Sequence, residues 1–157
     1  MQLFLVRHAA AVPRGRLRND AARPLTDEGR ERFVRLVKGL ERLGLRFSLV
    51  RHSPWKRARE TAELLAPLCD GELREDPRLA DEPSEELIKS LRGDRVALVG
   101  HEPWLGELLA RLVTGDADLG GHFELKKGAV AWLEGRPRPG EMTLRALLPP
   151  SVSRRAR

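Results

Sequence analysis

Short apolar runs and longer amphipathic segments alternate along most of the chain. Residues 3–6 and residues 96–99 are continuous apolar runs, which are typical of strands buried on both faces of a largely parallel sheet. From residue 27 to about residue 43, apolar side chains recur at every third or fourth position, with Thr26 as N-cap and Gly44 as a stop. This alternation predicts one α/β or α+β domain.

The same reasoning predicts a further strand and two further helices. Residues 46–51 are predicted to be a strand, and Ser53 and Pro54 suit the N-cap and first position of a helix that runs to about Cys69. After the strand at residues 96–99, residues 100–103 form a turn that leads into another amphipathic helix. A strand, a sharp turn and a helix therefore follow one another three times.

The carboxyl-terminal part of the chain has a different pattern. Residues 129–134 and 142–148 are predicted to be a closing pair of strands, because the turn-rich residues 135–140 separate them. No internal repeat or linker interrupts residues 1–150, so we expect a single domain there. Residues 151–157 are mostly basic and are expected to form a disordered tail.

Composition narrows the class of protein. The 157 residues are 41% hydrophobic and 33% charged, with no apolar run long enough to span a bilayer, so we expect a soluble protein without a membrane partner. No secretion signal is recognisable, and the single cysteine, Cys69, has no partner for an internal disulfide, so a cytoplasmic location is expected. The net charge of +6 predicts attraction to phosphoproteins, phosphate esters and nucleic acids alike.

Basic side chains gather where the predicted parallel strands end. Arg7 and His8, residues 53–57 and His101 each follow such a strand directly, and open α/β sheets bind their ligands at that edge. Two of these turns lead into helix N-termini, which favour phosphate, and Arg57 lies in the first turn of one of them. Without a matching set of Cys, Asp or Glu ligands, the cluster suits a phosphate rather than a metal.

A phosphate site needs a nucleophile if it is to catalyse a reaction. A neutral imidazole nitrogen can attack phosphorus and form a phosphohistidine that water later opens, and His8 is the candidate. Arginines around the phosphoryl group would neutralise its oxygens, so neither magnesium nor another cofactor is expected. Taken singly, His8 would be interpreted as a histidine that ends a strand with its ring bound to a backbone carbonyl, His101 as a turn residue and Arg57 as part of a solvated helix face. Only their convergence reverses that interpretation.

Four motifs, in order along the chain, resemble those of the histidine phosphatase (phosphoglycerate mutase-like) superfamily. They are Leu-Val-Arg-His at 5–8, Arg-Pro-Leu-Thr at 23–26, Ser-Pro-Trp-Lys-Arg-Ala at 53–58 and Val-Gly-His-Glu-Pro at 99–103. With the short length, the order is most similar to that of the SixA-type phosphohistidine phosphatases, and the match spans residues 1 to about 148.

The resemblance implies a fold and a set of site residues. The fold would be a three-layer α/β/α sandwich with a mostly parallel central sheet and a C-terminal strand pair. His8 would be the nucleophile, Arg7, Arg57 and His101 would form the phosphate pocket, and Arg23 would be a secondary pocket residue. A histidine-containing phosphotransfer domain is the partner that the resemblance implies.

Larger members of this superfamily use a carboxylic acid to protonate an alkoxide leaving group, and the nearest candidates here are Asp81 and Glu82. Both lie in the polar residues 80–86, where we expect the carboxylates to form a helix N-terminal turn instead. A phosphohistidine needs no strong acid, because its imidazole can leave protonated. The short stretch of residues 70–95 leaves little chain for a lid, so we expect a pocket open to phosphate carried by a protein.

We therefore predict a phosphohistidine phosphatase that acts on histidine-phosphorylated proteins through phospho-His8. One alternative is a small-molecule phosphomonoesterase or mutase of the same superfamily, which an essential Asp81 or Glu82 would support. The other is a non-catalytic polyanion or nucleic-acid binding module, suggested by the basic composition. Aromatic residues make up only 4% of the chain and tyrosine is absent, so surfaces for base stacking are scarce and nucleic acid is disfavoured.

Overall fold

The computed structural model describes residues 1–151, so the predicted basic tail lies, apart from Ser151, outside the described residues. A six-stranded sheet has the order β3-β2-β4-β1-β5-β6. Strands β1 to β4 pair in parallel, whereas β5 pairs antiparallel with both β1 and β6. The strands are β1 (Gln2–Arg7), β2 (Phe47–His52), β3 (Cys69–Glu75), β4 (Arg95–Gly100), β5 (Val130–Gly135) and β6 (Met142–Leu148).

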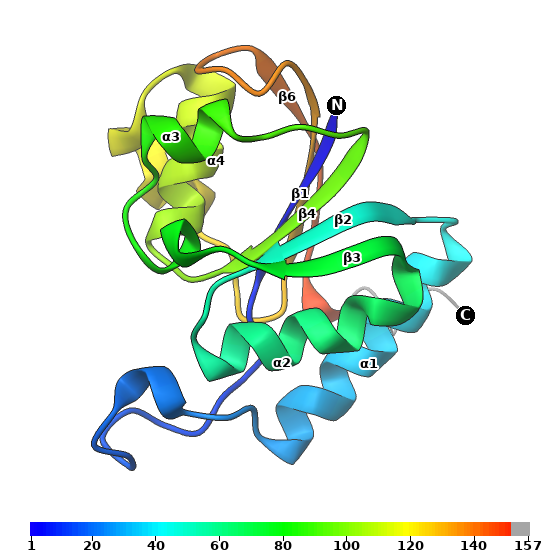
Figure 1. Cartoon of the computed structure of the whole chain (residues 1–157), viewed down its shortest axis with the longest axis vertical. Coiled ribbons are helices and arrows are strands. Elements are labelled where there is room, and N and C mark those ends of the chain that lie inside the picture. The colour runs from blue at the N-terminus through cyan, green and yellow to red at the C-terminus, as the bar shows by residue number, and fades with distance from the viewer. Residues whose placement is uncertain (152–157) are drawn as a thin grey trace.

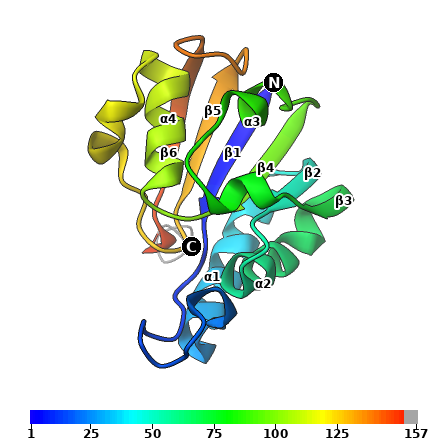
Figure 2. The same cartoon turned by 60° about the vertical axis from the view of Figure 1, so that its left-hand side comes forward.

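Helices cover both faces of this sheet. The α-helices are α1 (Asp27–Arg42), α2 (Lys56–Leu65), α3 (Glu85–Lys89) and α4 (Trp104–Thr114). Short 3-10 helices are η1 (Asp20–Ala22), η2 (Ala66–Leu68), η3 (Pro77–Ala80) and η4 (Ala117–Phe123). Helices α1 and α2 lie on one face and α3 and α4 on the other (Figures 1 and 2). The three-layer α/β/α fold with a C-terminal strand pair is confirmed.

Strand β1 shows why its sequence is apolar throughout. Phe4 and Val6 are buried in the core beneath α1 and α2, whereas Leu3 and Leu5 are buried in the core beneath α3 and α4. Successive side chains of a strand point to opposite faces, so a central strand between two helical layers has no polar position. The predicted strand, buried on both faces, is confirmed.

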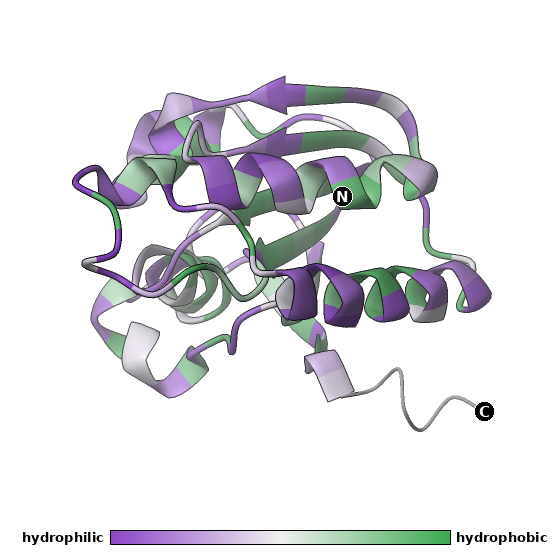
Figure 3. Cartoon of the chain, turned by 90° about the horizontal axis from the view of Figure 1, so that it is seen from below, coloured by the Kyte–Doolittle hydropathy of each residue, from purple (hydrophilic) through white to green (hydrophobic). Residues whose placement is uncertain are grey.

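Helix α1 follows its predicted pattern closely. The Thr26 hydroxyl accepts a hydrogen bond from the Gly29 N–H at 3.0 Å, and the buried side chains between Phe33 and Leu40 face the sheet. Hydrophobic and hydrophilic residues therefore alternate along the ribbon of α1 in Figure 3. Gly44 adopts a φ of +72° just after the helix, a conformation that glycine reaches without strain.

The second predicted helix was too long at both ends. It begins at Lys56 and ends at Leu65, and Cys69 is instead the first residue of β3. Pro67 lies in η2 between the two elements, where a residue without an N–H favours the end of an α-helix. The sequence did not reveal β3, because this edge strand is mostly exposed and lacks an apolar alternation.

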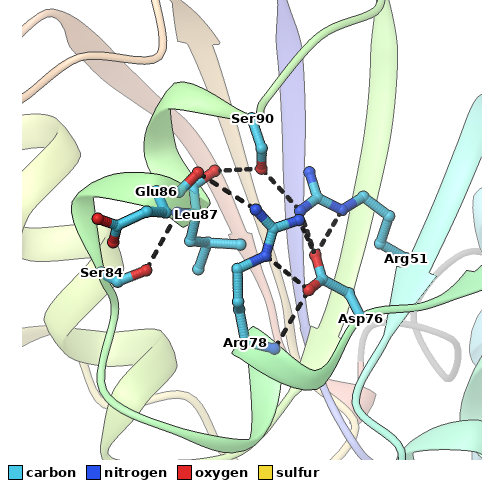
Figure 4. A network of polar contacts seen from close by, with 7 residues as sticks. All are labelled: Arg51, Asp76, Arg78, Ser84, Glu86, Leu87 and Ser90. Atoms are coloured by element: carbon cyan, nitrogen blue, oxygen red, sulfur yellow. Dashed lines mark hydrogen bonds and ion pairs between the residues drawn. The ribbon is translucent and has the colours of Figure 1, made fainter.

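Residues 70–95 are more than a short connection. They hold η3 and α3 as well as most of β3, and Leu79, Leu87 and Ile88 are buried in the core beneath α4. Asp76 organises this segment: it is 4% exposed and binds Arg51 and Arg78, with Arg78 Nε donating to Oδ1 at 2.8 Å (Figure 4). No helix within residues 1–151 is long and apolar enough to cross a bilayer.

Candidate active site

The three predicted turns meet at one edge of the sheet. Arg7 is the last residue of β1 and lies opposite Gly100, the last residue of β4. His52, the last residue of β2, lies opposite Val99 of β4. Since β2, β4 and β1 are neighbours in the sheet, the segments that follow them lie side by side at their carboxyl ends.

His8 is buried and held in one orientation. Its Nδ1 lies 2.7 Å from the Ala9 carbonyl, and a carbonyl can only accept, so Nδ1 carries the ring proton and Nε2 keeps a lone pair. Arg57 Nε donates to this Nε2 at 3.3 Å. Burial, together with the charges of Arg57 and Arg7, lowers the pKa of His8 to about 3 despite the opposing hydrogen bond to Ala9. The imidazole is therefore neutral near pH 7.

Thr61 and Gly29 position the backbone that follows His8, and neither was among the predicted site residues. The Thr61 hydroxyl accepts from the Ala9 N–H at 3.0 Å and donates to the Arg57 carbonyl at 2.7 Å. It thus ties helix α2 to the chain beside the nucleophile candidate. At Gly29, a Cβ would stand 2.2 Å from the Ala10 carbonyl oxygen, so only glycine allows this close approach.

His101 lies against His8, with their ring centroids 5.3 Å apart. Its Nε2 is 2.8 Å from the Ser53 hydroxyl, and its buried Nδ1 has no hydrogen-bond partner among residues 1–151. Ser53 is therefore not the predicted N-cap: its hydroxyl accepts from the Trp55 N–H at 3.2 Å, and Trp55 directly precedes α2. Burial, followed by the charges of His8 and Arg57, lowers the pKa of His101 to about 3.

Arg57 and Arg23 are both buried, and they hold a carboxylate between them. Asp20 Oδ2 accepts from Arg57 Nη2 at 3.1 Å, and Asp20 Oδ1 accepts from Arg23 Nε at 2.7 Å. Burial alone raises the pKa of Asp20, but the bonds from Arg23 and Arg57 outweigh it, so the net pKa is lowered. Asp20 was not among the predicted site residues, although its place three residues before Arg23 could have suggested it.

Arg7 and Glu102 lie near each other on another side of the cluster. Arg7 Nη1 donates to the Leu125 carbonyl at 2.7 Å, and its buried Nε has no hydrogen-bond partner among the described residues. Burial raises the pKa of Glu102 to about 7, although the charge of Arg7 opposes that rise. No feature of the sequence predicts this raised pKa, because a glutamate after a strand is normally solvated.

Glu102 also lines an acidic cavity of about 620 Å³. Its other acidic residues are Glu82, Glu107, Asp118 and Glu124. No three His, Cys, Asp or Glu side chains in the part of the chain that the structure describes converge closely enough to hold a metal ion. The edge of the sheet thus has a cationic centre beside an anionic cavity.

Asp81 and Glu82 are exposed, and their predicted place in a helix N-terminal turn was wrong. Ser84 is the N-cap of α3, so Glu85 begins the first turn, and Asp81 Oδ1 instead accepts from the Glu82 N–H at 2.8 Å. Serine is among the preferred N-caps, which explains the later start. Asp81 lines a small cavity with His101. A role for either carboxylate as an acid stays a prediction.

Comparisons with known proteins identify the family of this chain. The family model described as the histidine phosphatase superfamily (branch 1) matches residues 3–83. An uncharacterized protein of Picosynechococcus sp. is 35% identical over 144 residues, which make up 85% of this chain and 84% of that protein.

Solved structures share the fold. The protein histidine phosphatase SixA complexed with tungstate has a TM-score of 0.79 at 22% identity, covering 97% of this chain and 99% of that chain. The alpha-ribazole phosphatase from Shigella flexneri has a TM-score of 0.72 at 22% identity, covering 96% and 97%. Phosphoserine phosphatase from Entamoeba histolytica has a TM-score of 0.72 at 15% identity, covering 94% and 96%. The resemblance drawn from the four motifs is confirmed: this chain belongs to the histidine phosphatase superfamily, branch 1.

Proposed function

We propose that this protein is a phosphohistidine phosphatase that removes phosphate from histidine-phosphorylated proteins through a covalent phospho-His8 intermediate. The observation that carries the proposal is the fixed orientation of His8. Its Nδ1 donates to the Ala9 carbonyl, so the lone pair on Nε2 faces the cationic cluster. A neutral, oriented imidazole nitrogen beside arginines is suited to attack on phosphorus.

In the first step, the lone pair of His8 Nε2 attacks phosphorus in line with the substrate's P–N bond. That bond breaks as the Nε2–P bond forms, and the substrate imidazole leaves as a neutral ring because its other nitrogen already carries a proton. The ring of His8 gains positive charge, which the hydrogen bond from Nδ1 to the Ala9 carbonyl stabilises. In the second step, water attacks phosphorus, the Nε2–P bond breaks, and orthophosphate forms.

The other residues of the cluster bind the phosphoryl oxygens. Ser53 Oγ accepts from the Trp55 N–H, so its own proton can go to His101 Nε2. The proton of His101 then lies on Nδ1, which lacks a partner among the described residues and can donate to a phosphoryl oxygen. Arg7 and Arg57 neutralise the remaining charge, so the scheme uses no metal ion.

Arg57 and Arg23 bind one anionic group, the carboxylate of Asp20, between them. A phosphoryl oxygen would take the place of the Asp20 carboxylate between these two guanidinium groups. This exchange assigns Arg23 to the pocket as a secondary binding residue. Phosphate is a good match, because it offers planar guanidinium groups several acceptor oxygens at once.

A second candidate is a small-molecule phosphomonoesterase or mutase. An alkoxide leaving group needs a proton, and Glu102, with a pKa of about 7, retains one in part of the population at neutral pH. The SixA neighbour is named for a protein substrate, whereas the alpha-ribazole and phosphoserine phosphatases are named for small ones. Loss of ester hydrolysis in Glu102→Gln, with phosphohistidine hydrolysis retained, would favour this second candidate.

The test compares two substrates in EDTA: a protein that carries phosphohistidine, and an alkyl phosphate monoester. We expect rapid release of phosphate from the protein, slow release from the ester, and neither with His8→Ala. His122→Ala, which removes an exposed histidine, is the matched control and should keep both rates. Activity that survives in His8→Ala would overturn the mechanism, and a preferred ester would overturn the choice of substrate.

A further inference from the structure

A basic loop, defined here as residues 13–18 (Pro-Arg-Gly-Arg-Leu-Arg), projects from the molecule beside the candidate active site. All six residues are exposed. Figures 1 and 2 show the dark-blue segment after β1 extending away from the sheet, past the end of α1. None of its three arginine side chains forms an ion pair or a hydrogen bond with another described residue.

Three arginines without an ion pair lie within five residues of this loop, a denser group than elsewhere on the described surface. Several solvent-accessible arginines elsewhere lie beside a carboxylate; examples are Arg32 with Glu28, Arg46 with Asp70, Arg74 with Glu72 and Arg145 with Glu134. In the loop, three guanidinium groups within five residues repel one another without such compensation. An anionic surface that approached the loop would relieve that repulsion.

The base of the loop is tied to the phosphate pocket. Ala11 and Leu25 form an isolated antiparallel bridge, and Arg23 Nη1 donates to the Val12 carbonyl at 2.6 Å. The charge of Arg14 lowers the pKa of both Arg7 and Arg57, although burial is the larger cause at each. The basic loop therefore adjoins the place where a phosphoryl group would bind.

The loop also has an apolar centre. Leu17 is 43% exposed and stands between Arg16 and Arg18 in the sequence. Arginine is enriched at surfaces that bind proteins, and Leu17 adds an exposed apolar side chain between two of the arginines. Nucleic acid fits less well, because the loop has no aromatic side chain on which a base could stack.

We propose that the basic loop docks an acidic surface of the phosphorylated protein substrate, next to the residue that carries the phosphate. This inference rests on the proposed function and names the chemistry of the partner. Leu17 supplies an apolar contact, while the arginines steer the partner and fix its orientation. The acidic cavity beside Glu102 disfavours the same partner on that side, so the partner's acidic surface faces the loop.

The experiment compares kcat/KM for a phosphohistidine-bearing protein with that for phosphoramidate, a small P–N substrate. In the triple variant Arg14→Ser, Arg16→Ser, Arg18→Ser, we expect kcat/KM for the protein to fall about 10–100-fold more than that for phosphoramidate. The difference should lie in KM and should shrink as salt is raised. Leu17→Ser should also lower kcat/KM for the protein selectively, but with little dependence on salt.

The matched control removes three other exposed arginines, in Arg92→Ser, Arg136→Ser, Arg138→Ser. These residues line a separate cavity beside Met1, at the opposite end of β1 from His8. Equal losses on both substrates, or the same selective loss in the control, would overturn the docking role. So would single-stranded nucleic acid that binds the wild type tightly and the loop variant weakly. A wild type inactive on the phosphoprotein would overturn the proposed function itself, a result distinct from these.

Discussion

Two clusters in this protein place an aspartate between two arginines, yet only one of them buries its aspartate. The clusters are Arg51–Asp76–Arg78, drawn in Figure 4, and Arg57–Asp20–Arg23 at the candidate active site. In the first, the Asp76 side chain is 4% exposed and one arginine reaches solvent. In the second, the two arginines are buried and the Asp20 side chain is 42% exposed.

The difference separates a structural cluster from a binding site. An anion from solvent cannot replace a buried carboxylate unless the fold opens. Asp76 therefore acts as a structural link between β2 and η3. Buried guanidinium groups with an exposed counterion can instead accept another anion from solvent. The same pair of residue types thus stabilises the fold at one place and prepares a phosphate site at the other.

The largest expected effect comes from a substitution that breaks the Arg51–Asp76–Arg78 cluster. Asp76→Ala leaves the guanidinium of Arg51 buried without its carboxylate, and such losses destabilise proteins by about 3–5 kcal/mol. Asp20→Ala should cost less, because the Asp20 side chain is 42% exposed and an anion or water from solvent can take its place beside Arg23 and Arg57. Urea unfolding of both variants measures the difference. Equal losses would show that exposure does not distinguish the two clusters.

The next effect concerns catalysis. Arg57→Ala removes a buried cation that contacts His8, so we expect phosphate release to slow about 100–1,000-fold. Arg59→Ala, two residues further along α2 and exposed, is the control and should stay near the wild-type rate. Steady-state rates on the phosphohistidine protein provide the measurement. A loss of less than about tenfold would remove Arg57 from the proposed pocket.

The dependence of stability on pH sharpens the same comparison. His8 and His101 have pKa values of about 3 in the folded protein, against about 6.5 in the unfolded chain. At pH values between these two pKa values, the unfolded chain binds more protons than the folded protein does. The free energy of unfolding therefore falls as pH drops below about 6.5.

Each histidine should contribute a slope of about 1.4 kcal/mol per pH unit in that range. His8→Gln should therefore flatten the curve measured by urea unfolding between about pH 6 and pH 4, whereas His122→Gln removes an exposed imidazole as control. Burial alone raises the pKa of Asp76, but the bonds from Arg78 and Arg51 lower it overall. The contribution of Asp76 to the free energy of unfolding is therefore lost only below the range between about pH 6 and pH 4. An unchanged slope in His8→Gln would contradict the neutral, buried state of His8.

The smallest effect tests the exchange of anions. Asp20→Asn removes a negative charge from between Arg23 and Arg57, so orthophosphate should inhibit about twofold to fivefold more strongly. Competitive inhibition constants for orthophosphate measure this change. Weaker inhibition in Asp20→Asn would mean that the carboxylate serves mainly to hold the two arginines in place.

Much of the fold could be predicted from the sequence, because the signals that specify most strands and helices are local. The apolar run of β1, the cap at Thr26 and the stop at Gly44 each depend on neighbours within a few residues. Strand β3 could not be predicted, because an exposed edge strand has no apolar pattern to reveal it. Helix α2 was predicted too long because its apolar pattern continues through η2 after the helix has ended.

The candidate active site likewise has features that follow from the sequence and features that only the tertiary structure shows. The sequence by itself determined that Arg7, His8 and His101 follow buried strands, because apolar runs and turn residues act over short distances. Only the tertiary structure decided which nitrogen of His8 is free, and that Asp20 and Thr61 support the site. Thr61 lies 52 positions from Ala9, and Asp20 lies 37 positions from Arg57. Partners so far apart are brought together only by packing of the helices on the sheet, so these two contacts have no local signal in the sequence.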